Sequence, residues 1–137
     1  MNLETLIAQL TSHEGIRLEP YRCPAGYLTI GVGRNLETVG ISEWEARIML
    51  YDDIARAADA CRDLFPNFET LSDTRQHVLI DMCFNLGKAG LAQFIKMREA
   101  VLAGQWKRAA SEMINSKWAD QVKSRAVTLA NMMIKGR

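Results

Sequence analysis

The sequence predicts an α+β fold in which a long helix joins a small β-containing lobe to a helical lobe. Three observations predict it. Apolar residues recur at helical spacing through most of the chain, and a β-prone stretch punctuated by glycine and proline interrupts them over residues 17–39. A continuous helical pattern of 22 residues, 42–63, follows that stretch. With 137 residues and 48% apolar side chains, the chain is long enough for its own core.

We expect a single domain over residues 1–137. The small lobe should cover about residues 13–45, and the helical lobe about residues 64–137 together with the N-terminal helix. Leu3, Leu6, Ile7 and Leu10 repeat at helical spacing, which predicts that N-terminal helix over residues 2–12. Gly15 is suited to stop it.

The stretch from residue 17 to residue 39 is predicted to form a small antiparallel hairpin or three-stranded sheet. Pro20, Pro24 and Gly26 indicate turns, and residues 27–33 are β-prone. Ser42 and Glu45 then have the spacing of a capping box, which predicts the start of the long helix.

Further helices are predicted over residues 73–86, 90–103, 105–115 and 121–135. The first is apolar nearly all round in its middle, as is typical of a helix at the centre of a bundle, and Gly87 should end it. Gly104 should end the second.

Charge is distributed unevenly along the chain although the net charge is only +1. Residues 1–87 hold 7 Lys and Arg against 13 Asp and Glu, whereas residues 88–137 hold 10 against 3. The basic half indicates either an anionic partner or a solvated helical surface whose charges partly balance the acidic half. No nucleic-acid-binding motif is present, so we expect no nucleic-acid partner.

No apolar run of 18 residues exists, and the N-terminus lacks a signal-peptide pattern, so we expect neither stable membrane insertion nor a cleaved leader.

Three cysteines and two histidines form no zinc pattern, and no metal or cofactor is expected. Cys61 and Cys83 fall on apolar helix faces and are expected to be buried in the core. Cys23 differs because it lies in a turn.

Glu14, Cys23 and Thr29 are the candidate catalytic residues. Glu14 comes where a helix ends, and the helix dipole there disfavours a negative charge, which suits a proton donor. Cys23 and Thr29 return around a short turn and could face it. Each residue also has an ordinary structural interpretation: a solvated surface acid, a turn residue and a threonine suited to a strand.

The spacing E-x8-C-x5-T and the segment HEGIRLEPYRCPAGYLTIGVG, residues 13–33, resemble the active-site region of the T-even phage lysozymes, glycoside hydrolase family 24. RQHVLIDMCFNLGKAGLAQF, residues 75–94, is similar to the central helix of that family. The segment from Trp106 through Trp118 to Arg125 is similar to its C-terminal part. These three matches, in the family's order, imply a lysozyme-like fold.

The resemblance implies a role for each matching position. Glu14 would protonate the glycosidic oxygen between N-acetylmuramic acid and N-acetylglucosamine, and Thr29 would help position the attacking water. Arg125 would pair with Glu14; its ordinary interpretation is a solvated helix charge. Phe84 would line the substrate cleft, with core packing as the alternative.

Two positions depart from the family's reference member. Cys23 stands where that member has aspartate, and Arg34 where it has histidine; some phage endolysins have cysteine at the first of these positions. A thiol with a pKa of about 8.5 is only slightly ionised at pH 7, and we expect Arg22 and Arg34 to lower that value. Cys23 would then be a thiolate base or electrostatic stabiliser, a nucleophile, or a group that holds the water.

The resemblance therefore implies a phage or prophage endolysin, a monomeric muramidase that cleaves the peptidoglycan glycan strand. It would accumulate in the host cytoplasm and reach the periplasmic wall after release by a holin. One alternative is a non-catalytic lysozyme-like protein that binds glycan. Another is a cysteine-dependent amidase or peptidase, for which His13 is the candidate partner of Cys23.

Overall fold

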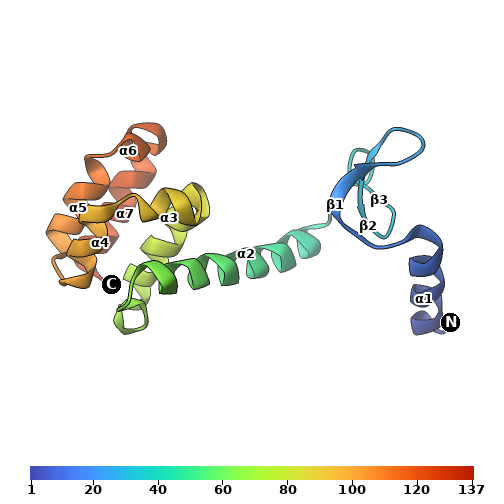
Figure 1. Cartoon of the computed structure of the whole chain (residues 1–137), viewed down its shortest axis with the longest axis horizontal. Helices are drawn as coiled ribbons and strands as arrows, with labels where there is room; N and C mark the ends of the chain where they lie inside the picture. The colour runs from blue at the N-terminus through green and yellow to red at the C-terminus, as the bar shows by residue number, and fades with distance from the viewer. The chain divides into compact units, whose positions relative to one another are not determined.

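The computed structural model describes all 137 residues and divides into two compact units, Met1–Ile48 and Met49–Arg137. Seven α-helices, one short 3-10 helix and a three-stranded antiparallel sheet make up the chain, so the predicted α+β class is confirmed (Figure 1). The sheet lies in the first unit, and the second unit is entirely helical.

The first unit opens with α1, Leu3–Glu14, two residues longer at its C-terminal end than predicted. The Asn2 side chain accepts a hydrogen bond of 3.0 Å from the backbone N–H of Thr5, which satisfies one of the free donors of the first turn. Gly15, at φ 74°, ends the helix, as expected. Glu14 is therefore the last helical residue.

The predicted sheet is present and has three strands. β1 is Arg17–Arg22, β2 is Leu28–Gly31 and β3 is Arg34–Asn35, in the order β1-β2-β3. Tyr21 lies opposite Thr29 in the first antiparallel pair, whose register shifts between Arg17 and Tyr21. The two connections between strands are short, so the turn that holds Cys23 directly precedes the strand that holds Thr29.

α2, Glu43–Leu64, is the 22-residue helix that the pattern predicted. Its capping box forms in both directions: the backbone N–H of Ser42 donates to Glu45 Oε2 at 2.7 Å, and that of Glu45 donates to Ser42 Oγ at 3.1 Å. The buried residues of α2 all lie in its second half: Ala57, Ala58, Ala60 and Cys61.

The second unit contains η1, Phe68–Thr70, and five helices. They are α3 (Asp73–Ala92), α4 (Ile95–Leu102), α5 (Trp106–Ile114), α6 (Lys117–Val122) and α7 (Ser124–Lys135). Their core is apolar and includes Phe65, Leu79, Met82, Met113 and Met133. Cys61 and Cys83 are both in it, as expected.

Two predicted boundaries differ from the structure. Helical geometry in α3 is interrupted at Gly87 (φ 73°, ψ 167°), as predicted, but the helix resumes and continues to Ala92. The helix predicted over residues 121–135 is divided at Lys123, whose φ of 50° lies in the left-handed region. A lysine there has a steric cost, so no propensity rule places a break at it.

α1 belongs to the first compact unit; the prediction that it packs with the helical lobe stays a prediction. No single helix meets the length and hydropathy requirements of a membrane span, although α3 and α4, bent by 105°, meet them as a broken pair. Both helices contribute apolar side chains to the core of the second unit.

Candidate active site

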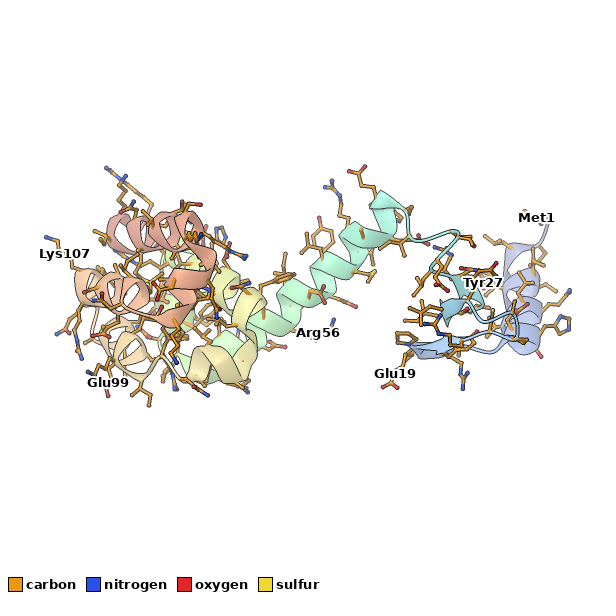
Figure 2. All side chains as sticks on the ribbon, turned by 90° about the horizontal axis from the view of Figure 1, so that it is seen from above. Met1, Glu19, Tyr27, Arg56, Glu99 and Lys107 are labelled. Atoms are coloured by element: carbon orange, nitrogen blue, oxygen red, sulfur yellow. The ribbon has the colours of Figure 1, made fainter.

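Cys23 begins the tight turn that connects β1 to β2. Its backbone N–H donates to the Tyr27 carbonyl at 3.0 Å, and the Gly26 N–H donates back to the Cys23 carbonyl at 2.8 Å. Gly26 has a φ of 89°, a conformation that a residue with a Cβ rarely adopts. Figure 2 labels Tyr27 in this turn and Glu19 on β1. The half-buried Cys23 side chain is thus held at the turn of the β1–β2 hairpin.

The turn stabilises the ionised form of the Cys23 thiol. The backbone N–H of Tyr27 makes the largest contribution to lowering the pKa of Cys23, partial burial opposes it, and the N–H groups of Ala25 and Gly26 and the Thr29 hydroxyl add to the lowering. Hydrogen bonds donated to a thiolate favour its charged state.

The expectation that Arg22 and Arg34 lower this pKa is wrong. Neither arginine is among the causes of the shift. Arg22 donates instead to the Gly26 carbonyl at 3.1 Å and lies 3.4 Å from Glu37. The pKa of Cys23 is therefore lowered by backbone N–H groups and a hydroxyl, not by the charged side chains that the sequence suggested.

Thr29 lies in the middle strand and is the one buried polar residue of the chain, with 3% of its surface exposed. Its hydroxyl donates to the Tyr27 carbonyl at 2.8 Å and also lies within hydrogen-bonding reach of the Cys23 sulfur. A hydroxyl has a single hydrogen, so it can serve the carbonyl or the thiolate but not both. The structure brings Cys23 and Thr29 together, as predicted from their spacing.

Glu14 is held against the turn that connects β2 to β3. A Cβ added at Gly33 would lie 3.0 Å from Glu14 Oε2 and 3.3 Å from its Cδ, so the carboxyl group rests on the glycine itself. Gly33 also has a φ of 70°. No role was predicted for this glycine from the sequence, although two glycines that flank a single residue in a strand-like run indicate a close approach of another group to the backbone.

Arg34 is engaged by Glu45 rather than by the catalytic candidates. Its guanidinium donates to both carboxylate oxygens, at 2.9 and 2.7 Å, and to the Gly40 carbonyl at 3.1 Å. The Arg34 hydrogen bonds, together with those of the capping box, lower the pKa of Glu45 to about 2. This bidentate pair fastens the start of α2 to β3 and supports the site from outside.

Phe84 and Arg125 belong to the second unit. Phe84 is 49% exposed and is not in the core; it borders a hollow of about 510 Å³ together with Ala57, Ala60 and Gly87. Arg125 bonds to Asp81, an acid that sequence analysis did not single out, at 2.8 Å from Nε. The substrate-binding role of Phe84 and the pairing of Arg125 with Glu14 stay predictions.

The structure contains no group of three or more His, Cys, Asp and Glu side chains that could hold a metal ion. What the first unit offers is organic acid–base chemistry: an exposed carboxyl at a helix end, a thiol prone to ionise and a buried hydroxyl. A helix that ends at the carboxyl, a three-stranded sheet with the thiol and the hydroxyl, a long helix and a helical bundle follow one another in the order of a lysozyme-like protein.

A family model described as phage lysozyme matches residues 11–131, and the chain belongs to the phage lysozyme family. It is similar to the pre-baseplate central spike protein Gp5 of Enterobacteria phage T4, at 28% identity over 163 residues. That similarity covers 96% of this chain but only 28% of the spike protein. A probable T4-type lysozyme 1 of Dictyostelium discoideum is 26% identical over 142 residues, covering 82% of this chain and 84% of the relative.

Proposed function

We propose that this protein is a muramidase that hydrolyses the β-1,4 bond between N-acetylmuramic acid and N-acetylglucosamine in peptidoglycan, and that it serves a phage or prophage as an endolysin. The observation that carries the proposal is the hairpin turn at Cys23, whose backbone hydrogen bonds lower the pKa of the thiol. The resemblance to the family matches Cys23 to the aspartate of the reference member. Membership in the phage lysozyme family supports the substrate class.

Glu14 is the general acid in this mechanism. Its carboxyl donates a proton to the glycosidic oxygen as the bond to the anomeric carbon breaks, and the sugar acquires oxocarbenium-like character. The carboxyl needs a fixed direction for this step, and its contact with Gly33 limits where it can lie. Proton transfer by a well-positioned group contributes about 10²- to 10⁴-fold to the rate.

Cys23 acts on the opposite side of the bond in one of three ways. As a thiolate it removes a proton from the attacking water or stabilises the positive charge of the sugar; as a nucleophile it forms a thioglycoside; as a thiol it only holds the water. We favour the thiolate base, because a thiolate would then keep the role of the carboxylate that Cys23 replaces in the reference family member. Thr29, next to the sulfur, would help orient the same water.

The first test is catalytic. Protein added to Gram-negative cells with a permeabilised outer membrane should clear the suspension and release reducing ends, and Glu14→Gln should do neither. Mass spectrometry should find disaccharides with their peptide stems attached. Free stems would instead support the amidase alternative, with His13 as the partner of Cys23.

The anomer of the fresh product distinguishes the roles of Cys23. A thiolate base that activates water gives inversion, whereas a thioglycoside intermediate followed by hydrolysis gives retention. Proton NMR of the reducing end, recorded before mutarotation, reads the outcome. Retention would remove the base role from the mechanism.

Similarity to a spike protein supports a second candidate, a lysozyme-like part of a phage structural assembly that grips glycan without cutting it. Binding to purified sacculi without release of reducing ends would favour it.

Delivery is also a proposal: the enzyme would accumulate in the host cytoplasm as a monomer and reach the periplasmic wall through a holin lesion. The basic half of the chain would attract the anionic wall, less strongly at high salt.

A further inference from the structure

Glu37, two residues beyond β3, contacts both arms of the hairpin that carries Cys23. Its Oε2 accepts a hydrogen bond of 2.6 Å from the backbone N–H of Leu28, the residue before Thr29. The same oxygen lies 3.4 Å from Arg22, the residue before Cys23. One carboxylate oxygen therefore joins the chain on either side of the turn.

Arg22 extends this connection into the turn itself. Its Nη1 donates to the Gly26 carbonyl at 3.1 Å while it contacts Glu37. The Gly26 N–H in turn donates to the Cys23 carbonyl at 2.8 Å, so the Gly26 carbonyl belongs to the residue that closes the turn on Cys23. The carboxylate, the guanidinium and the carbonyl thus form a continuous bracket, Glu37–Arg22–Gly26, across the open side of the turn.

The bracket is itself held at a defined position. Asn35 Oδ1 accepts hydrogen bonds from the backbone N–H groups of Glu37, at 2.9 Å, and Thr38, at 3.0 Å. The Leu36 N–H donates to the Leu28 carbonyl at 2.8 Å, so the chain leaving β3 continues to pair with β2. Glu37 therefore approaches Leu28 from a backbone that is already fixed.

We propose that Glu37 is a positioning residue for Cys23 and Thr29: it fixes the conformation of the turn that begins at Cys23 and of the backbone that leads to Thr29. The catalytic meaning of this assignment rests on the proposed muramidase function. The effect on the thiol does not, because it can be measured on the folded protein without substrate.

A purely stabilising role is a poor account of the same contacts. The Glu37 side chain is 47% exposed and that of Arg22 is 65% exposed, and neither residue belongs to the apolar core. Exposed ion pairs contribute little to stability. Removing the Glu37 carboxylate should therefore leave the protein folded while it loosens the donors around Cys23.

The test measures the rate at which iodoacetamide alkylates Cys23 between pH 6 and pH 10, with peptide mass mapping to separate it from the buried Cys61 and Cys83. Glu37→Ala should slow alkylation at pH 7 by about three- to tenfold, because a smaller fraction of the thiol is ionised. The titration midpoint should rise correspondingly. Glu19→Ala, which removes an exposed acid from β1, should leave the rate unchanged.

Glu37→Gln keeps a side-chain oxygen that can accept from the Leu28 N–H, so it should restore the rate to within about twofold of the parent. A rate in Glu37→Ala equal to the parent's would overturn the proposal. Equal losses in the alanine and glutamine variants would also overturn it, since the hydrogen bond to Leu28 would then have no part in the effect.

Wall-clearing activity, measured on the same samples, distinguishes the positioning role of Glu37 from the proposed muramidase function. A slower thiol with reduced clearing supports both the positioning role and the muramidase. Slower alkylation of Cys23 in Glu37→Ala, with a parent protein that does not clear walls, would support the positioning role and contradict the proposed function. Reduced clearing with an unchanged alkylation rate of Cys23 would mean that Glu37 affects activity without acting through Cys23, and it would overturn the proposal.

Discussion

Replacing Gly33 by alanine should impair catalysis by displacing the Glu14 carboxyl, and replacing Gly31 by alanine should not. A Cβ at position 33 would meet Glu14 Oε2 at 3.0 Å and Cδ at 3.3 Å, whereas a Cβ at position 31 would have nothing within 4 Å. Both glycines have nearly the same positive φ, 70° and 69°. The pair therefore separates backbone strain from collision with the carboxyl.

The magnitudes follow from these contacts. Alanine at a positive φ costs about 1–2 kcal/mol at either position, so the two variants should lose similar stability. Only at position 33 must the carboxyl also move, by a few tenths of an ångström. Because a misplacement of about 1 Å can cost about 10²-fold in rate, we expect Gly33→Ala to lose roughly three- to tenfold beyond any loss in Gly31→Ala.

The assay combines urea unfolding at pH 7 with initial rates of reducing-end release from purified peptidoglycan. Rates should be taken at a temperature where both variants are fully folded, so that stability does not enter the comparison. Equal rates in the two variants would refute the reasoning, because the contact between Gly33 and Glu14 would then have no bearing on proton donation.

Three further predictions concern other contacts. Cys23→Ala should lose about 10²-fold or more in activity, while Cys23→Asp should stay active and move the rise of rate with pH to more acidic values, since a carboxyl ionises at lower pH than even this stabilised thiol. Glu45→Gln should be less stable than the parent at pH 6, and the urea midpoints should converge as the pH falls toward about 2, because a lowered folded-state pKa stabilises only while the carboxyl is ionised. Arg75→Met should lower the free energy of unfolding by about 2 kcal/mol, since Arg75 donates to the carbonyls of Met133 and Ile134 at the end of α7 and lies over the Trp106 ring.

Each of these has a defined contrary result. Full activity in Cys23→Ala would reduce the thiol to a turn residue. A stability difference for Glu45→Gln that persists unchanged at pH 2 would mean that ionisation of the pair with Arg34 is irrelevant, and Glu43→Gln provides the matched control for a neighbouring, more exposed acid. Arg75→Lys should fall between the parent and Arg75→Met, because an ammonium group keeps the charge but not the planar fork.

Local sequence rules predicted the parts of the fold that depend on neighbouring residues. The capping box of Ser42 and Glu45, the short sheet and the interruption at Gly87 each follow from a few adjacent side chains, and all three are present. The spacing of Cys23 and Thr29 likewise predicted their proximity, because a strand–turn–strand unit brings such positions together.

The errors occurred where long-range contacts decide. Arg34 was assigned to Cys23, yet its partner is Glu45, which lies at the same separation of 11 residues on the other side, so distance along the chain could not choose between them. Asp81, which bonds to Arg125 from 44 residues away, was likewise beyond any local pattern, while the pairing of Arg125 with Glu14 stays a prediction. The groups that lower the pKa of Cys23 are mostly backbone N–H groups, which every residue except proline has, so no pattern of side chains could identify them.

The division between the two compact units falls within a continuous helix, between Ile48 and Met49 of α2, rather than in a loop. A recombinant fragment cut at that point would begin with four unbonded N–H groups and no capping residue. Anyone who wishes to express the helical unit separately should therefore start it at Ile41, so that Ser42 and Glu45 still close the first turn.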